Sequence, residues 1–144
     1  MIHKKYPNAQ FTVNMVRKLK ERYGFVSKSA DRITTKFPVK GRPKEFDITD
    51  ELRTACKSIV PGMIDSIAEL IATYDPEFQE NIRSNVILAG GGSQMTGLPN
   101  LIEEAMAELG GGKVTRVDEP LFAGSNGALK MAKQMPRHFW QMLA

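Results

Sequence analysis

The chain has 144 residues, of which 42% are hydrophobic and 25% are charged, ordinary values for one compact domain or for two small lobes. No apolar run approaches the roughly 20 residues of a membrane-spanning helix, and no apolar core follows the basic N-terminus, which excludes a transmembrane segment and a signal peptide. A single cysteine, Cys56, excludes an intrachain disulfide framework and favours a reducing cytoplasm.

The formal net charge of +4 is concentrated in residues 1–44, where twelve lysines and arginines accompany only Glu21 and Asp31. Such an asymmetry suits nucleic acid, anionic lipid or a nucleotide, and it equally suits a solvated lysine-rich face. No ladder of aromatic residues interleaves these bases, so we predict no nucleic-acid partner.

The first predicted element is an amphipathic helix over residues 11–23. Thr12 or Asn14 is expected to cap its start, and Gly24 is expected to end it. One face is charged, whereas the other carries apolar side chains at helical spacing, namely Met15, Val16, Leu19 and Tyr23.

Residues 33–49 are rich in β-branched side chains and predict a hairpin that turns at residues 40–43. Pro38 restricts its strand to an edge or a bulge. A long helix with a wide apolar stripe is predicted over residues 50–71, and Pro61 should kink it or restart it as a second segment.

The second half alternates between helices and short strands. We predict helices over residues 76–82, 97–109 and 122–135, a buried strand over residues 85–89 and a second short strand over residues 113–117. This order predicts an α/β layer in which the two strands lie side by side.

The sharpest local feature is the glycine turn, Gly90–Gly92, which follows the first of these strands directly. Open α/β sheets bind ligands at this edge, and consecutive glycines let a flat or anionic group approach the backbone. The spacing matches neither a Walker A loop nor a dinucleotide fingerprint. Taken alone, the turn is either a ligand loop or a tight connection from strand to helix.

Other enzyme classes lack support in the sequence. His3 and His138 stand at opposite ends of the chain with no cluster of carboxylates or cysteines beside them, so we predict neither a metal site nor a Ser-His-Asp site. Cys56 lies on the apolar stripe of the long helix and is interpreted as a core residue.

Taken together, the motifs carry a family resemblance. The runs are FTVNMVRKLKERYGFV, ELRTACKSIVPGMIDSIAELI, a Pro76-Glu77 pair, NVILAGGGSQMTGLPNLIEE and VTRVDEPLFAGSNGALKMA. In order and spacing they resemble the bacterial actin-like ATPases, the branch that contains MreB and the magnetosome actins. The short segment over residues 23–47 is closest to the magnetosome actins.

The resemblance implies an α/β fold, a partial actin-like (ribonuclease-H-like) ATPase domain with a small α+β lobe. Residues 1–49 would form the small lobe, the upper subdomain of the actin-like C-terminal half. Residues 50–135 would form the α/β lobe with the adenosine-binding loop, and residues 136–144 a tail.

The resemblance also implies a site for ATP or ADP. Lys20 falls where the family places a lysine against the adenine, and Glu21 falls where a glutamate binds the ribose hydroxyls. A carboxylate can accept both hydroxyl protons, and a lysine stem can cover a purine face. The implied nucleotide-binding residues are Arg17, Lys20, Glu21, Gly90, Gly91, Gly92, Ser93, Gln94, Met95 and Phe122.

The family's two phosphate-binding hairpins have no counterpart in this sequence. They would precede Met1, so we expect the chain to be a C-terminal piece of a longer protein or a truncated paralogue. Magnesium is expected only with that other half. Because phosphoryl transfer depends on phosphate positioning and charge stabilisation, we predict no efficient ATP hydrolysis by this chain alone.

By resemblance, the function is that of a cytoplasmic, cytoskeletal filament subunit that aligns organelles such as magnetosomes. Its partners would be further copies of itself or a full-length homologue, joined head to tail, and organelle-associated adaptor proteins. The alternative is an interaction module without nucleotide, which binds the full-length filament through an exposed strand edge and modulates it.

Overall fold

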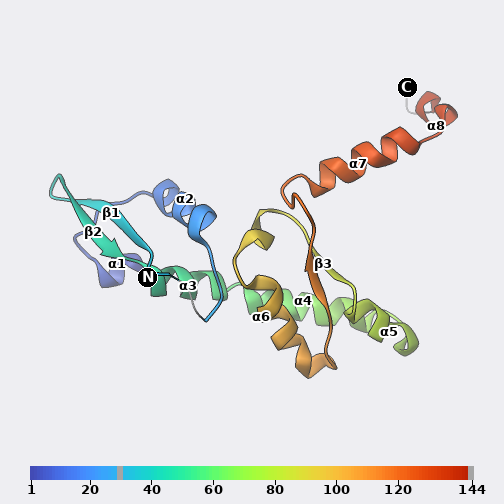
Figure 1. The fold of residues 1–144 in the computed structure, drawn as a ribbon, viewed down its shortest axis with the longest axis horizontal. Coiled ribbons are helices and arrows are strands. Elements are labelled where there is room, and N and C mark those ends of the chain that lie inside the picture. The colour runs from blue at the N-terminus through green and yellow to red at the C-terminus, as the bar shows by residue number, and fades with distance from the viewer. Residues whose placement is uncertain (29–30, 143–144) are drawn as a thin grey trace.

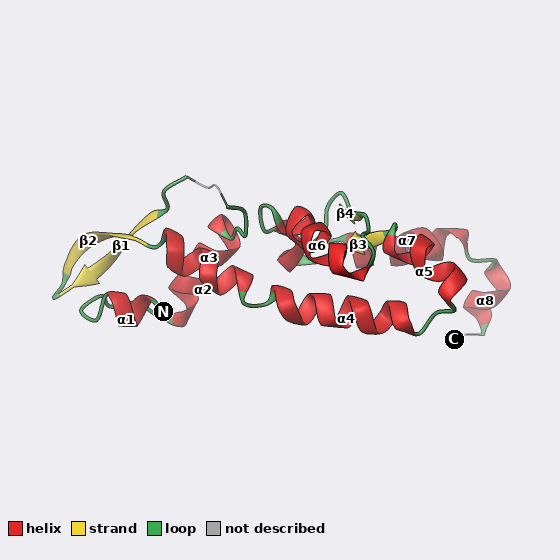
Figure 2. Cartoon of the chain, turned by 90° about the horizontal axis from the view of Figure 1, so that it is seen from below, coloured by secondary structure: helices red, strands yellow, loops and turns green. Residues whose placement is uncertain are grey.

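The computed structural model describes residues 1–28 and 31–142. The chain is elongated, with a β-hairpin at one end, an α/β body beside it, and two final helices that project beyond the body (Figures 1 and 2). Within the described ranges, no helix reaches the combination of length and hydropathy that a membrane-spanning segment requires.

The N-terminal part contains three helices and one hairpin. Their bounds are α1 Ile2–Lys5, α2 Val13–Tyr23, β1 Thr34–Val39, β2 Arg42–Asp47 and α3 Thr49–Lys57. The predicted amphipathic helix and the predicted hairpin are both present. The sequence did not predict α1, because four residues form a single turn without a periodic pattern.

The hairpin turns tightly at two residues, Lys40 and Gly41, whose φ angles are 52° and 78°. Positive φ at both positions matches the twist of the flanking strands. Pro38 lies opposite Pro43 in an unbroken antiparallel register, so the strand has no bulge. Both strands of this two-stranded hairpin are edge strands. The two prolines also form a non-hydrogen-bonded pair, next to the hydrogen-bonded pair that closes the turn, so neither needs a backbone N–H there.

The second part contains the body and the projecting helices. Their bounds are α4 Val60–Ala72, α5 Pro76–Arg83, β3 Val86–Leu88, α6 Leu98–Met106, β4 Val114–Arg116, α7 Ala123–Gln134 and α8 Arg137–Gln141. The predicted long helix is interrupted after Lys57 and restarts at Val60, with Pro61 in the first turn of α4. Strands β3 and β4 are parallel neighbours, which confirms the predicted α/β layer. The prediction that the first strand is buried was wrong, because Ile87 is 57% exposed and only Leu88 of β3 is buried: side chains alternate between the two faces of a strand, and the core covers one face.

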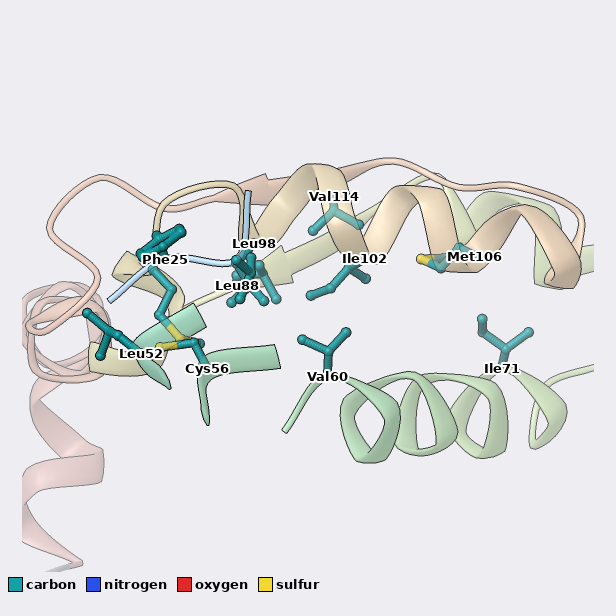
Figure 3. Packing of buried hydrophobic residues seen from close by; sticks show 12 residues of the cluster. Phe25, Leu52, Cys56, Val60, Ile71, Leu88, Leu98, Ile102, Met106 and Val114 are labelled. Carbon is teal, nitrogen blue, oxygen red and sulfur yellow. The ribbon is translucent and has the colours of Figure 1, made fainter. Parts of the chain in front are cut away.

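The main core lies between α4 and α6. Leu98, Ile102 and Met106 recur every four residues along α6 and are completely buried, and they face Val60 and Ile71 of α4 (Figure 3). The remaining buried members of this cluster are Phe25, Val26, Leu52, Cys56, Leu88, Met95 and Val114. A second, smaller cluster fills the hairpin lobe and consists of Ala9, Phe37, Phe46 and Ile48.

The main core therefore takes residues from both sides of the predicted lobe boundary at residues 49 and 50, and that boundary stays a prediction. Helix α7 confirms the predicted C-terminal helix. None of its residues is buried, and it extends away from the body (Figure 1).

Candidate functional site

Helix α2 carries two of the predicted site residues in its last turn. The helix begins at a Thr12 cap, whose hydroxyl accepts a hydrogen bond from the Met15 N–H at 3.3 Å. It ends where the Gly24 N–H donates to the Lys20 carbonyl at 2.8 Å. Lys20 and Glu21 are exposed, as expected for a helix with no buried residue.

A short parallel bridge joins the end of α2 to the segment after the glycine turn. The Val26 N–H donates to the Thr96 carbonyl at 2.9 Å, and the Thr96 N–H donates to the Gly24 carbonyl at 3.2 Å. This bridge pairs Phe25 with Thr96, which are 71 residues apart in the chain. It holds α2 beside the glycine turn.

Gly24 ends α2 at the start of this bridge. A Cβ atom at this position would lie 2.5 Å from the Lys20 carbonyl oxygen and 3.4 Å from Cγ of Met95. Contacts under 3 Å are not tolerated without movement, and the carbonyl belongs to the helix backbone. The Met95 distance is an ordinary contact, so Gly24 is required by the end of its own helix, as the sequence predicted, and it also borders Met95.

Two hydrogen bonds at Gly90 hold the glycine turn. Gly90 has a φ of 81°, a conformation that favours glycine. Its carbonyl accepts from the Ser93 hydroxyl at 2.7 Å, and its N–H donates to the Pro120 carbonyl at 2.7 Å. Ser93 is 4% exposed and therefore supports the turn from inside.

Helix α2 and the glycine turn face each other across a cavity of about 360 Å³, which we call the site cavity. This confirms that the two segments lie together. The residues that line the cavity are Lys20, Glu21, Gly24, Gly91, Gly92, Gln94, Met95 and Leu121.

Four of the predicted residues lie outside this lining. Gly90 and Ser93 form the base of the glycine turn. Arg17 lines a neighbouring apolar cavity between α1, α2 and α3, which also includes Lys20. Phe122 is 60% exposed and lies outside the lining, and its neighbour Leu121 borders the site cavity. No pattern in the sequence distinguishes these two adjacent apolar residues.

The lining is chemically mixed. Glu21 supplies a carboxylate that accepts hydrogen bonds, Lys20 supplies a cation on a long apolar stem, and Gln94 supplies an amide that both donates and accepts. Met95 and Leu121 supply apolar surface. A Cβ at Gly92 would meet nothing within 4 Å, so this part of the turn is open to an approaching ligand.

The lining offers few ligands for a metal ion. It contains only one carboxylate, and the described residues contain no group of three or more His, Cys, Asp or Glu side chains placed to hold a metal. Burial raises the pKa of the Cys56 thiol, which keeps it protonated and unreactive. Its predicted place in the core is confirmed.

A short parallel pair of strands, a glycine turn after the first strand and an amphipathic helix across a small cavity form the arrangement that the sequence predicted for a partial actin-like domain. The family model for MreB/Mbl protein matches residues 2–139, and the chain belongs to this family.

Relatives and solved structures agree with this assignment. Actin-like protein MamK of Paramagnetospirillum magneticum is 33% identical over 142 residues, covering 99% of this chain and 41% of the relative. The structure of a MamK double helical filament superposes with a TM-score of 0.89 at 33% identity, covering 94% of this chain and 42% of that chain. A non-polymerising MamK mutant bound to AMPPNP gives a TM-score of 0.86 at 33% identity, covering 92% and 41%.

The chain thus spans about two fifths of the length of the curated relatives that it matches, 41% of the MamK protein named above. Over that span, the similar structures confirm the predicted partial actin-like fold.

Proposed function

We propose that this chain binds the adenosine part of ATP or ADP in the site cavity. The observation that supports the proposal is the placement of Lys20 and Glu21 opposite Gly91 and Gly92 across one cavity. Glu21 would accept hydrogen bonds from the ribose hydroxyls, and the Lys20 stem would cover the base. A similar structure that contains AMPPNP supports the same ligand class.

Isothermal titration of ATP into the chain tests this proposal. We expect weak binding, because the cavity lining recognises only the nucleoside. Glu21→Ala should weaken the affinity for ATP by about tenfold, which corresponds to the loss of one charge-assisted hydrogen bond. Glu108→Ala is the matched control, since Glu108 is exposed and remote from the cavity lining. If the parent chain, Glu21→Ala and Glu108→Ala bind ATP with equal affinity, Glu21 does not bind the ribose.

The described cavity does not account for phosphoryl transfer. Catalysis of that reaction needs several charged groups around the phosphates and a metal, whereas the lining has one carboxylate and one cation. We therefore assign nucleoside recognition to these residues and no hydrolytic step.

We also propose that copies of this chain associate head to tail. Residues 32–44, which include the hairpin, contain five basic residues and no acid, namely Arg32, Lys36, Lys40, Arg42 and Lys44. Residues 58–82 contain five acids and no lysine or arginine, namely Asp65, Glu69, Asp75, Glu77 and Glu80. The hairpin and α5 lie towards opposite ends of the molecule (Figure 2).

Opposite charges at opposite ends favour a heterologous contact, which generates open polymers. Within the part of the chain that the structure describes, only Arg32 of these ten residues forms an ion pair, so the other nine charges are available to a neighbouring molecule. The MamK double helical filament supports assembly of this kind.

Light scattering at low and high salt tests the contact. The double variant Lys40→Glu, Arg42→Glu should not assemble. Adding Glu77→Lys and Glu80→Lys to the same chain should restore assembly, because the charges at the two ends are then exchanged. The matched control is Lys130→Glu on α7. Undiminished assembly of the first variant, or assembly that is insensitive to salt, would exclude this contact.

In cells, we propose a cytoplasmic, cytoskeletal role in aligning organelles through adaptor proteins, by analogy with the MamK relatives. A fluorescent fusion expressed in a bacterium that contains magnetosomes should form lines along the organelle chain. Diffuse fluorescence, with the fusion protein intact, would count against this role.

A further inference from the structure

Gln94 lies between two cavities. It lines the site cavity together with Glu21 and Gly24, and the same three residues line a neighbouring cavity of about 530 Å³, which we call the second cavity. The site cavity alone, at about 360 Å³, is near the lower end of the range of roughly 300–1,000 Å³ that small-molecule sites cover. The second cavity therefore offers room for a group attached to a nucleoside.

The backbone at Gln94 is fixed by its two neighbours, whereas its own side chain is exposed. Ser93 is 4% exposed and Met95 is 5% exposed. The Ser93 hydroxyl donates to the Gly90 carbonyl at 2.7 Å, and the Met95 N–H donates to the Gly92 carbonyl at 3.3 Å. A side chain that lines both cavities from a fixed backbone forms the boundary between them.

The second cavity is built on the bridge between α2 and the body. Its lining includes Phe25 and Thr96, the bridged pair, and Phe25 is buried in the main core. The Thr96 N–H donates to the carbonyl of Gly24, which lines both cavities, at 3.2 Å. This side of the second cavity is therefore part of the ordered core.

The second cavity has an excess of negative charge. Its lining contains two carboxylates, Glu21 and Asp31, and one cation, Arg22. The Arg22 guanidinium lies 5.1 Å from the centre of the Tyr23 ring, and among the described residues none of these three charged side chains forms an ion pair. Such a lining attracts a positively charged group and repels a phosphate.

The Gln94 amide matches one edge of adenine. A glutamine amide can accept from the exocyclic amino group of adenine and donate to the adjacent ring nitrogen at the same time. A substituent on that amino group would collide with Gln94, and without the Gln94 side chain it would extend into the second cavity.

We propose that Gln94 determines the specificity of the site: it closes the site cavity at the amino edge of the base, and beyond it the second cavity is a subsite for a cationic group attached to that edge. The site then selects an unsubstituted adenine. The inference rests on the proposed nucleotide site, because it assigns a base selectivity to binding there.

Titrations followed by nuclear magnetic resonance, which measures weak affinities, test the selectivity with three ligands. These are ATP, ATP with an aminohexyl chain on its exocyclic amino group (aminohexyl-ATP), and ATP with an uncharged hexyl chain there (hexyl-ATP). The parent chain should bind ATP about tenfold more tightly than either analogue, since one good bidentate contact is lost. Gln94→Ala should weaken ATP binding by about tenfold and should abolish the preference for ATP.

The charge of the subsite is tested in the Gln94→Ala background. Aminohexyl-ATP should bind about two- to fivefold more tightly than hexyl-ATP at low salt, the value of an exposed ion pair, and Asp31→Asn should remove this advantage. Asp118→Asn is the matched control, because Gln94 also lines a third cavity whose exposed carboxylates include Asp118. Asp118→Asn should preserve the advantage.

Three results would overturn the inference and leave the nucleotide site intact. They are equal binding of ATP and both analogues by the parent chain, an unchanged preference for ATP in Gln94→Ala, and an advantage of aminohexyl-ATP that is absent or depends on Asp118 instead of Asp31. Failure of the parent chain to bind ATP at all would overturn the nucleotide site and the inference together.

Discussion

Gly97→Ala adds one methyl group outside the cavity lining, and of such changes we expect it to disturb the site most. Gly97 follows Thr96, the residue bridged to Phe25, and it begins α6 with a φ of 83°. A Cβ here would lie 2.9 Å from Cβ of Ser27 and 3.0 Å from its backbone nitrogen. Gly97→Ala therefore combines an unfavourable backbone conformation with a collision against a segment that the bridge holds in place.

The two costs can be separated with a second glycine. Gly111 has a φ of 82°, and a Cβ there would meet nothing within 4 Å, so Gly111→Ala carries only the conformational cost. That cost is about 1–2 kcal/mol, reduced by about 0.4–1 kcal/mol because alanine also restricts the unfolded chain. Gly97→Ala should add about 1–3 kcal/mol of overpacking, for a total loss of roughly 1–5 kcal/mol.

Urea denaturation followed by far-UV circular dichroism measures both variants against the parent chain. We expect midpoints that fall in the order parent, Gly111→Ala, Gly97→Ala, with an unchanged dependence of the free energy of unfolding on urea. Losses of stability that agree within about 0.5 kcal/mol would refute the reasoning, because the collision with Ser27 would then contribute nothing.

Three further predictions concern the folded state. Hydrogen bonds from the Thr49 hydroxyl and N–H, and then the Arg32 guanidinium, lower the pKa of Asp47 from 3.8 to about 2. The stability that this carboxylate contributes is present above pH 3.8 and is lost as the pH falls to 2. Asp47→Asn should therefore flatten the dependence of the melting temperature on pH between pH 3.8 and pH 2. Ile102→Ala leaves a cavity in the main core and should lower the free energy of unfolding in urea by about 2–5 kcal/mol. Ile59→Ala, at a half-exposed position, should lower it far less. Buried Cys56 should react with a thiol reagent only at the rate of unfolding, and rapid reaction in the absence of denaturant would contradict its place in the core.

Local patterns predicted the secondary structure well where they were strong. The helical spacing in residues 11–23, the restart at Pro61 and the two short strands all appear in the fold, because each depends on neighbours within a few residues. Helix α1 was missed, since one turn of helix has no periodicity to detect.

The candidate site was predictable only in part. Family resemblance brought Lys20, Glu21 and the glycine turn together, and the cavity confirms that they are neighbours. Its two remaining wall residues, Gly24 and Leu121, depend on how segments far apart in the sequence pack. Whether Arg17 and Phe122 contact a nucleotide stays a prediction.

The bridge between Phe25 and Thr96 explains why the sequence was insufficient. It consists of two backbone hydrogen bonds, and such bonds leave no trace in side-chain patterns. Gly97, which follows Thr96, is required by the close approach of Ser27, whereas the sequence presents it as an ordinary helix boundary.

Because α2 has no buried residue, few contacts hold its last turn against the body. Phe25 and Val26 of the bridge are buried in the main core, so fraying of the last turn of α2 should cost less free energy than opening of the bridge itself. A ligand in the site cavity would touch Lys20 and Glu21 on one side and the glycine turn on the other. It would therefore oppose fraying of this turn, by a free energy that grows with the logarithm of the ligand concentration over its dissociation constant. Because the turn is exposed in the empty site, its order should respond to nucleotide more than the order of the core.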